Sequence, residues 1–207
     1  METIEFTGPP HAGKSTLAKE LGHRLYLKDV HNQIIRRGMR MPGSFIHRDN
    51  FYDRQLLILA ESVIGIIRLR DESKADILFV DQGPWNAVIF FTALAKRQLI
   101  SKEQAIAGIS FAMTNIHRID FVVLVKIPVE ASLQRTYLDL SMPQDLVRDR
   151  NFLEAFVQAS DEIEKELPEE SLIIDGTLPI KQNLEILEEV IISIAKSKNP
   201  SLVASQF

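Results

Sequence analysis

The sequence predicts a doubly wound α/β domain, with a five-stranded, mostly parallel sheet and helices on both faces. Short runs rich in β-branched and aromatic residues alternate along the 207-residue chain with longer segments whose apolar residues recur every three or four positions. This alternation is typical of parallel strands joined by crossover helices. No linker of biased composition divides the chain, and nothing repeats at a fixed period. We therefore expect one domain over residues 1–197, followed by a flexible tail over residues 198–207.

The expected strands differ in how clearly the sequence marks them. Residues 3–8 (TIEFTG) form a short first strand that ends at glycine, and residues 25–29 (LYLKD) are expected to form the second. Residues 76–81 (DILFVD) and 119–127 (IDFVVLVKI) contain unbroken apolar runs, the pattern of strands that are buried on both faces. Residues 171–176 (SLIIDG) are expected to form the last strand.

Helical patterns fill the intervals between these strands. Pro84 suits the first turn of one helix, Ser101 and Gln104 have the spacing of a capping box, and Pro128 opens a further helix. The remaining helices are expected from apolar periodicity over residues 14–25, 51–69, 102–117 and 180–196.

Composition excludes several classes of protein. The chain has 24 Lys and Arg against 28 Asp and Glu, so a net charge of −4 gives no general attraction to nucleic acid or to a membrane surface. The absence of cysteine excludes disulfides, thiolate metal sites and cysteine nucleophiles. No apolar run is long enough to span a bilayer, and the first strand leaves no room for a signal peptide, so we expect a cytoplasmic protein.

Residues 8–15 (GPPHAGKS) match the phosphate-binding pattern GxxxxGK[ST] and directly follow the first expected strand. In such a loop, backbone N–H groups surround phosphate oxygens, and the helix that begins near Lys14 adds its positive dipole end. Lys14 is expected to reach the outer phosphates, and the Ser15 hydroxyl to ligate Mg²⁺. A glycine turn that only joins a strand to a helix is the alternative. The expected nucleotide-binding residues are Gly8, Pro9, Pro10, His11, Ala12, Gly13, Lys14, Ser15 and Thr16.

Two acidic residues follow expected strands. Asp81 ends the strand of residues 76–81, where ligands collect in open α/β sheets. Its carboxylate can hold Mg²⁺ together with Ser15 or accept a proton from a substrate hydroxyl, although it could also only cap the next helix. Asp29, at the end of the expected second strand, is the weaker candidate for a general base. It is equally well explained as the N-cap of a helix over residues 31–37.

With these residues, the sequence resembles the nucleoside and nucleotide kinase branch of the P-loop fold, which includes thymidylate kinases and riboside or deoxynucleoside kinases. The resemblance follows GPPHAGKST, DILFVDQG, FVVLVKIPVEASLQR, an arginine-bearing stretch and LIIDGT in this order. It implies a helical lid over residues 135–150, whose arginines Arg135, Arg148 and Arg150 close over the phosphates. Each arginine could instead pair with an acid at the surface. It also implies that Gly176, Thr177 and Pro179 grip the adenine.

The chain departs from the thymidylate kinase pattern at the end of the third strand. Those kinases carry Asp-Arg there, with the arginine on the acceptor's phosphate, whereas this chain has the neutral amide of Gln82. A monophosphate acceptor would therefore need compensation from Arg36, Arg37 or Arg40. The region of residues 30–50, after the second strand, matches no substrate-specific signature.

The combined expectation is an ATP-dependent and Mg²⁺-dependent kinase that acts on a small acceptor such as a nucleoside or nucleotide. Lys14, Asp81, Asp29 and the three lid arginines are the expected catalytic residues, and Ser15 and Asp81 the expected metal ligands. The alternative is a nucleotide-dependent switch that hydrolyses ATP and acts through a protein partner. The net charge disfavours a kinase that acts on nucleic-acid ends. No membrane partner is expected, and the sequence allows a homodimer without requiring one.

Overall fold

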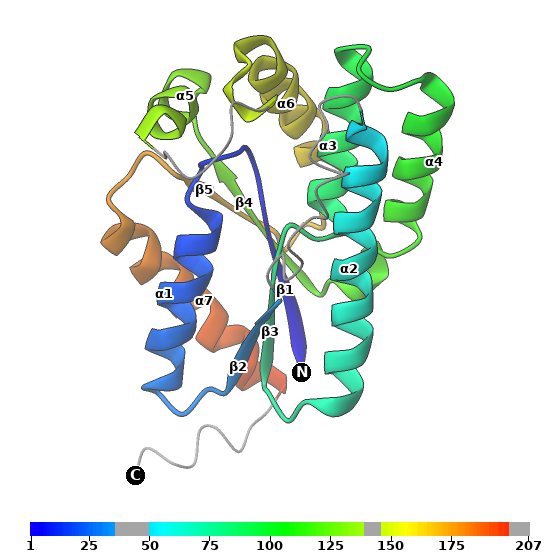
Figure 1. The fold of residues 1–207 in the computed structure, drawn as a ribbon. Helices are drawn as coiled ribbons and strands as arrows, with labels where there is room; N and C mark the ends of the chain where they lie inside the picture. Colours follow the sequence, from blue (N-terminus) through cyan, green and yellow to red (C-terminus); the bar gives the residue numbers. More distant parts are fainter. Residues whose placement is uncertain (36–49, 139–145, 199–207) are drawn as a thin grey trace.

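A five-stranded parallel sheet runs through the centre of the molecule (Figure 1). The computed structural model describes residues 1–35, 50–138 and 146–198. The sheet has the order β2-β3-β1-β4-β5, and each neighbouring pair is parallel. The strands are β1 (Glu2–Thr7), β2 (Asn32–Ile35), β3 (Ile77–Asp81), β4 (Phe121–Lys126) and β5 (Leu172–Asp175).

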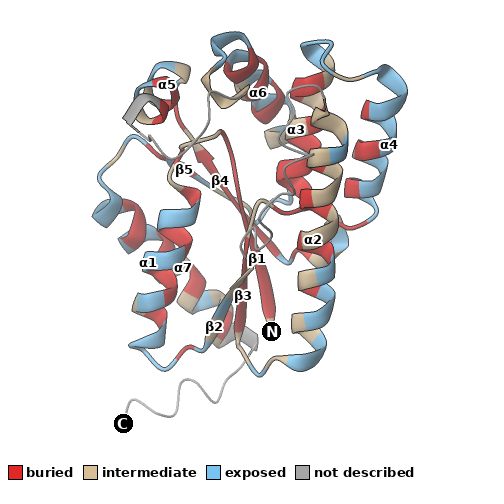
Figure 2. Ribbon diagram, in the orientation of Figure 1, coloured by how far each residue is buried: buried red, intermediate tan, exposed pale blue. Residues whose placement is uncertain are grey.

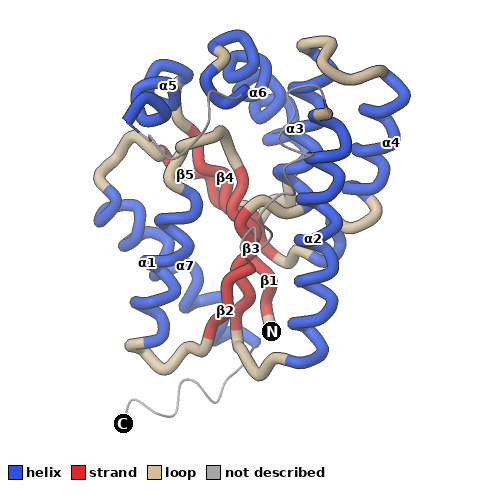
Figure 3. Tube along the Cα trace, viewed as in Figure 1, coloured by secondary structure: helices blue, strands red, loops and turns tan. Residues whose placement is uncertain are grey.

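Helices lie on both sides of the strands, as Figure 3 shows in blue around the red sheet. They are α1 (Lys14–Tyr26), α2 (Phe51–Glu72), α3 (Pro84–Lys96), α4 (Lys102–Met113), α5 (Val129–Leu138), α6 (Arg150–Ile163) and α7 (Ile180–Lys198). Short 3₁₀ helices occupy Ile116–Arg118, Leu146–Arg148 and Glu164–Glu166.

Alternation along the strands divides the core between the two faces of the sheet. On β3, Ile77 and Phe79 pack with α1 and α7, whereas Leu78 and Val80 face α2 and the start of α3. A second apolar layer forms farther out, where α2, α3, α4 and α6 pack against one another. Figure 2 shows the resulting buried sheet between helices with exposed outer faces. Because both faces are covered, β3 and β4 are apolar over most of their length, whereas β1 also carries two glutamates and two threonines.

The parallel register brings several strand ends to one edge of the sheet. Phe6 pairs with Asp81, Thr7 with Leu124, and Lys126 with Asp175. The loop that follows β1 therefore begins beside the end of β3 and crosses the end of β4. This edge carries the residues that the sequence singled out for phosphate and metal binding.

The expected fold class is confirmed, but the expected second strand at residues 25–29 is wrong. The leucine spacing that starts at Leu17 and Leu21 continues through Leu25, so α1 extends to Tyr26 and a turn follows. Asp29 lies in this turn with φ 59°, and the true strand β2 comes at residues 32–35, where a helix was the alternative expectation. β2 was hard to recognise because it is a short edge strand that begins with two amides.

The other expected strands are confirmed within two residues at each end, as is the capping box of Ser101 and Gln104. The helix α6 had not been delimited from the sequence. Arg36, Arg37, Arg40 and the centre of the expected lid lie outside the described residues, as does the tail beyond residue 198. Within the described ranges, none of the helices has the length and apolar character that crossing a bilayer requires.

The contact between α3 and α4 gives a test of the outer layer. A Cβ atom at Gly108 would lie 2.7 Å from ring atoms of Phe91, which is fully buried. We expect Gly108→Ala to lower the free energy of unfolding by about 1–3 kcal/mol through overpacking. Urea denaturation measures this change, with Ser110→Ala on the exposed side of α4 as the control. Helix propensity alone favours alanine over glycine and would make the variant more stable. A variant more stable than the wild type would therefore contradict this packing.

Candidate phosphate-binding site

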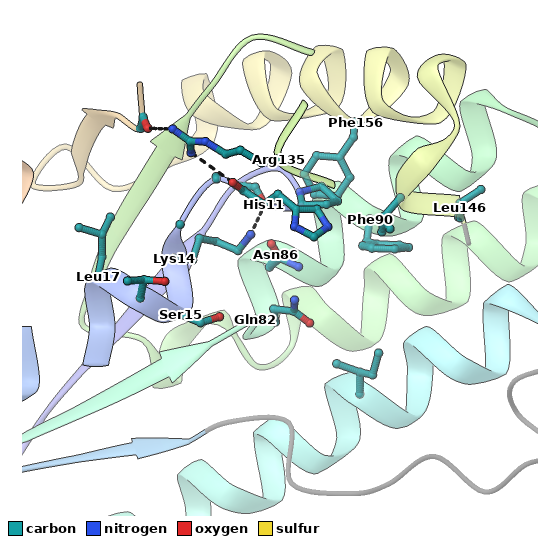
Figure 4. Close-up of a pocket in the computed structure, with 18 of the residues that line it drawn as sticks. His11, Lys14, Ser15, Leu17, Gln82, Asn86, Phe90, Arg135, Leu146 and Phe156 are labelled. Carbon is teal, nitrogen blue, oxygen red and sulfur yellow. Dashed lines mark hydrogen bonds between the residues drawn. The ribbon is translucent and has the colours of Figure 1, made fainter. Parts of the chain in front are cut away.

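A cavity of about 580 Å³ opens at the edge of the sheet where β1 and β3 end. One half is lined by the loop of residues 8–15, the start of α1 and the segment after β5. The other half is lined by side chains of α2, α3 and α6 and by the short helix Leu146–Arg148. Figure 4 shows this cavity with the phosphate loop on one side and aromatic rings on the other.

The path of the phosphate loop depends on two glycines. Gly8 has φ +132°, and a Cβ atom there would lie only 2.2 Å from the backbone oxygen of Val125 on β4. Gly13 has φ +97° and precedes the first residue of α1. Because side chains are strained in both conformations, these positions need glycine. They allow the loop to turn tightly over β4 before it enters α1.

Lys14 is buried in this loop and lines the cavity. Its ammonium group donates to the backbone oxygens of Gly8 and Pro9, at 2.9 and 2.7 Å. These bonds hold the long side chain across the loop instead of in solvent. A fixed cation at the cavity wall is suited to binding phosphate oxygens.

Ser15 and Asp81 meet as the sequence predicted. The Ser15 hydroxyl donates to Asp81 Oδ2 at 2.5 Å, across the gap between α1 and β3. The other carboxylate oxygen, Oδ1, is buried without a hydrogen-bond partner in the structure. A hydroxyl and a carboxylate are hard oxygen ligands of the kind that Mg²⁺ takes beside substrate phosphates. The pair and its orphaned oxygen therefore fit this ion.

Glu5 is the site residue that the sequence reading missed. It lies on β1, is fully buried, and accepts hydrogen bonds from the backbone N–H groups of Trp85 and Asn86 at 3.1 and 2.7 Å. Burial raises the pKa of Glu5 to about 8, partly offset by these N–H groups and increased by nearby Asp81. The signal in the sequence is a carboxyl group between Ile4 and Phe6, in the middle of the strand that leads into the phosphate loop. It fixes the start of α3, and hence the turn after Asp81, to β1.

Of the three expected lid arginines, only Arg135 lines the cavity. Its guanidinium donates to the backbone oxygen of His11 at 3.2 Å and to that of Gly176 at 2.8 Å. Arg135 therefore joins the phosphate loop to the segment after β5. It also places a positive charge at this end of the cavity.

Asp81 is joined to the cavity wall through its bond to Ser15 and does not line the cavity itself, and the remaining expected catalytic residues do not line it either. Arg150 is exposed and pairs with Glu130 at 2.8 Å and with Glu154 at 3.7 Å, which lowers the pKa of Glu130. Arg148 belongs to the 3₁₀ helix whose other two residues do line the cavity. Asp29 belongs to the turn before β2, at the amino ends of the strands, so the structure gives no support to its role as a general base.

After β5, only part of the expected adenine grip lines the cavity. Gly176 lines the cavity. It packs so tightly against Ile127 that a Cβ atom at this position would lie 2.7 Å from Ile127 Cγ2. Thr177 instead turns back, and its hydroxyl donates to Asp175 Oδ1 at 2.6 Å, which lowers the pKa of Asp175. The neighbouring cavity wall is formed by Leu178, Ile180 and Asn183.

The aromatic half of the cavity could not be recognised as a site from sequence. Its rings come from three helices, α2, α3 and α6. In the sequence, the apolar residues of each helix indicate only a helix that packs against the core. Polar side chains of α2, of α3 and of the turn that precedes α3 line the same half. The residues of this half are Phe51, Arg54, Gln55, Ile58, Gln82, Asn86, Phe90 and Phe156.

Comparison of the fold finds similar solved structures of deoxyadenosine kinase from M. mycoides. The structure with bound dATP has a TM-score of 0.71 at 15% sequence identity. The structure with the products dCMP and a flexible dCDP has a TM-score of 0.75 at 16% sequence identity. A third, with bound dCTP, has 0.63 at 15%. Each comparison covers 92% of this chain and 99% of the other. No protein-family model and no curated protein sequence matches this chain.

At this level of identity the likeness demonstrates a shared fold. The chain has the fold of the P-loop nucleoside kinases, the class that its sequence resembles.

The buried carboxyl of Glu5 predicts a pH dependence of stability. Because its pKa is raised to about 8 in the folded protein, the native state binds a proton that the unfolded chain releases above its ordinary value of 4.5. The free energy of unfolding should therefore fall as pH rises between these two values, by up to about 1.4 kcal/mol per pH unit. Glu5→Gln should abolish this fall.

Urea denaturation at a series of pH values measures this effect. Glu20→Gln, an exposed carboxylate on α1, is the control and should keep the wild-type pH dependence. Parallel stability profiles for Glu5→Gln and the wild type would show that Glu5 does not hold a proton in the folded state.

Proposed function

We propose that this protein is an ATP-dependent and Mg²⁺-dependent kinase that phosphorylates a hydroxyl of a nucleoside-like acceptor. The observation that carries this proposal is the shape of the cavity. A phosphate loop with a fitting metal pair opens onto an aromatic chamber in the same cavity. A kinase needs this arrangement because donor and acceptor must meet at the outermost phosphate.

The half beside the phosphate loop would take the donor. The loop N–H groups and Lys14 would hold the β- and γ-phosphates, and Ser15 and Asp81 would hold Mg²⁺. The ion, when bound, neutralises charge on the phosphate oxygens. Arg135 adds a positive charge at the end that Gly176 and Asn183 line, where the donor's base would lie. Such a kinase would use the ATP pool of the cytoplasm.

The aromatic half would take the acceptor. Phe51, Phe90 and Phe156 provide flat apolar surfaces, and the amide of Gln55 can pair with the polar edge of a base. Gln82 lines this half with φ 70°. A neutral amide supplies no cation for an acceptor phosphate, so in a nucleotide kinase that charge would have to come from another residue of this half, such as Arg54.

In the proposed reaction, the acceptor hydroxyl oxygen forms a bond to the γ-phosphorus as the bond to the β–γ bridging oxygen breaks. ADP leaves, and the hydroxyl proton passes to the Asp81 carboxylate. The position of Asp81 at the end of β3 and its bond to Ser15, which lines the cavity, support this role.

Incubation with γ-labelled ATP, Mg²⁺ and a panel of nucleosides, nucleotides and oligonucleotides tests this proposal. We expect label on a nucleoside, and Lys14→Ala should reduce transfer by about 100-fold or more because a transition-state cation is lost. Lys19→Ala, on the exposed face of α1, is the matched control and should transfer at the wild-type rate. Release of label only to water, accelerated by a protein partner, would instead indicate a nucleotide-dependent switch.

A further inference from the structure

We propose that Asn86 is a catalytic residue whose side-chain N–H group donates a hydrogen bond to the phosphoryl group during transfer. This inference rests on the proposed kinase function and assigns a role to a residue that the phosphate-loop pattern does not include. It follows from where the amide lies, how it is held and what its nitrogen faces.

Asn86 lies where the two halves of the cavity meet. It belongs to the first turn of α3 and lines the cavity although it is only 3% exposed. Figure 4 shows its amide beside Lys14 on the phosphate side and near Gln82 and Phe90 on the acceptor side. A phosphoryl group that moves from a donor on the loop to an acceptor among the rings passes this point.

The amide is held from two directions. The backbone N–H of Asn86 donates to Glu5 at 2.7 Å, and its side-chain oxygen accepts a bond from the Thr7 hydroxyl at 3.3 Å. Glu5 and Thr7 both belong to β1, which continues directly into the phosphate loop at Gly8. The amide is therefore fixed relative to the loop, and Glu5 and Thr7 act as positioning residues.

These contacts use the oxygen of the amide and not its nitrogen. Among the described residues, none accepts a hydrogen bond from Asn86 Nδ2. An amide nitrogen carries two N–H donors, so a ligand oxygen in the cavity can take a bond that the protein does not use.

A neutral donor at this point suits phosphoryl transfer. Negative charge is spread over the three equatorial oxygens of the transferring group, and a donor that is already oriented stabilises it without reorganisation. Asn86 exchanges no proton and no electron: the bond to the bridging oxygen breaks, the bond to the acceptor forms, and the amide stays unchanged. Its contribution therefore requires no change in its own protonation.

Steady-state kinetics and calorimetric binding of ATP test this role together. Asn86→Asp keeps the shape of the side chain but replaces the donor by a negative charge, and Asn86→Ala removes it. We expect kcat to fall by about 100- to 1,000-fold in both variants, because removal of one transition-state donor has an effect of this size. In Asn86→Ala, the Kd for ATP should stay within about threefold of the wild type, since the bond forms fully only during transfer. Asn86→Asp should in addition weaken ATP binding, because its negative charge lies beside the phosphates.

Thr7→Val tests the positioning and keeps the experiment decisive if Asn86 variants are unstable. It removes the hydroxyl that orients the amide but keeps the side-chain shape, and we expect kcat to fall by about tenfold with Kd unchanged. Thr7→Ser restores a hydroxyl and should recover the rate. Asn115→Ala, at a buried asparagine outside the cavity, is the matched control and should keep the wild-type kcat.

Two results would overturn the inference while leaving the kinase function intact. One is an Asn86→Asp variant that transfers phosphate at the wild-type rate. The other is a loss that appears in ATP affinity and not in kcat, because this would assign the amide to ground-state binding. A wild-type protein that phosphorylates none of the acceptors would instead refute the proposed function, and this inference with it.

Discussion

The site depends on the close approach of the β1 end to β4. Gly8 passes so near the backbone of Val125 that a side chain could not fit, and this contact sets the direction of the phosphate loop. From there the loop turns back into α1, which carries Ser15 toward the end of β3. The central position of β1 in the sheet therefore brings the loop, Ser15 and Asp81 together at one edge of the sheet, beside the cavity.

A second constraint is electrostatic. Two carboxyl groups, Glu5 and Asp81, lie close together below the cavity, and they differ in environment. Burial raises the pKa of Glu5 to about 8, so that no buried negative charge is added on β1 at neutral pH.

The sequence singled out the loop that lines one half of the cavity and not the rings that line the other half, for a physical reason. The loop residues are neighbours in the chain. Asp81 lies near them because the carboxyl ends of parallel strands meet at one edge of the sheet. The rings of Phe51, Phe90 and Phe156 meet only through the packing of three helices, which no local pattern encodes. Asp29 was expected at a strand end because residues 25–29 were predicted as a strand. The leucine spacing of α1 in fact continues to Leu25, and the helix ends at Tyr26.

The central claim is that Ser15 and Asp81 bind Mg²⁺ beside a nucleotide held by the phosphate loop. Calorimetric titration with ATP, in the presence and absence of Mg²⁺, tests it on the wild type and on Asp81→Asn. The ion should tighten wild-type binding by about tenfold or more, and the variant should bind ATP with no such gain. The claim would be contradicted if the wild type bound no ATP. It would also be contradicted if Mg²⁺ increased the ATP affinity of Asp81→Asn as much as that of the wild type.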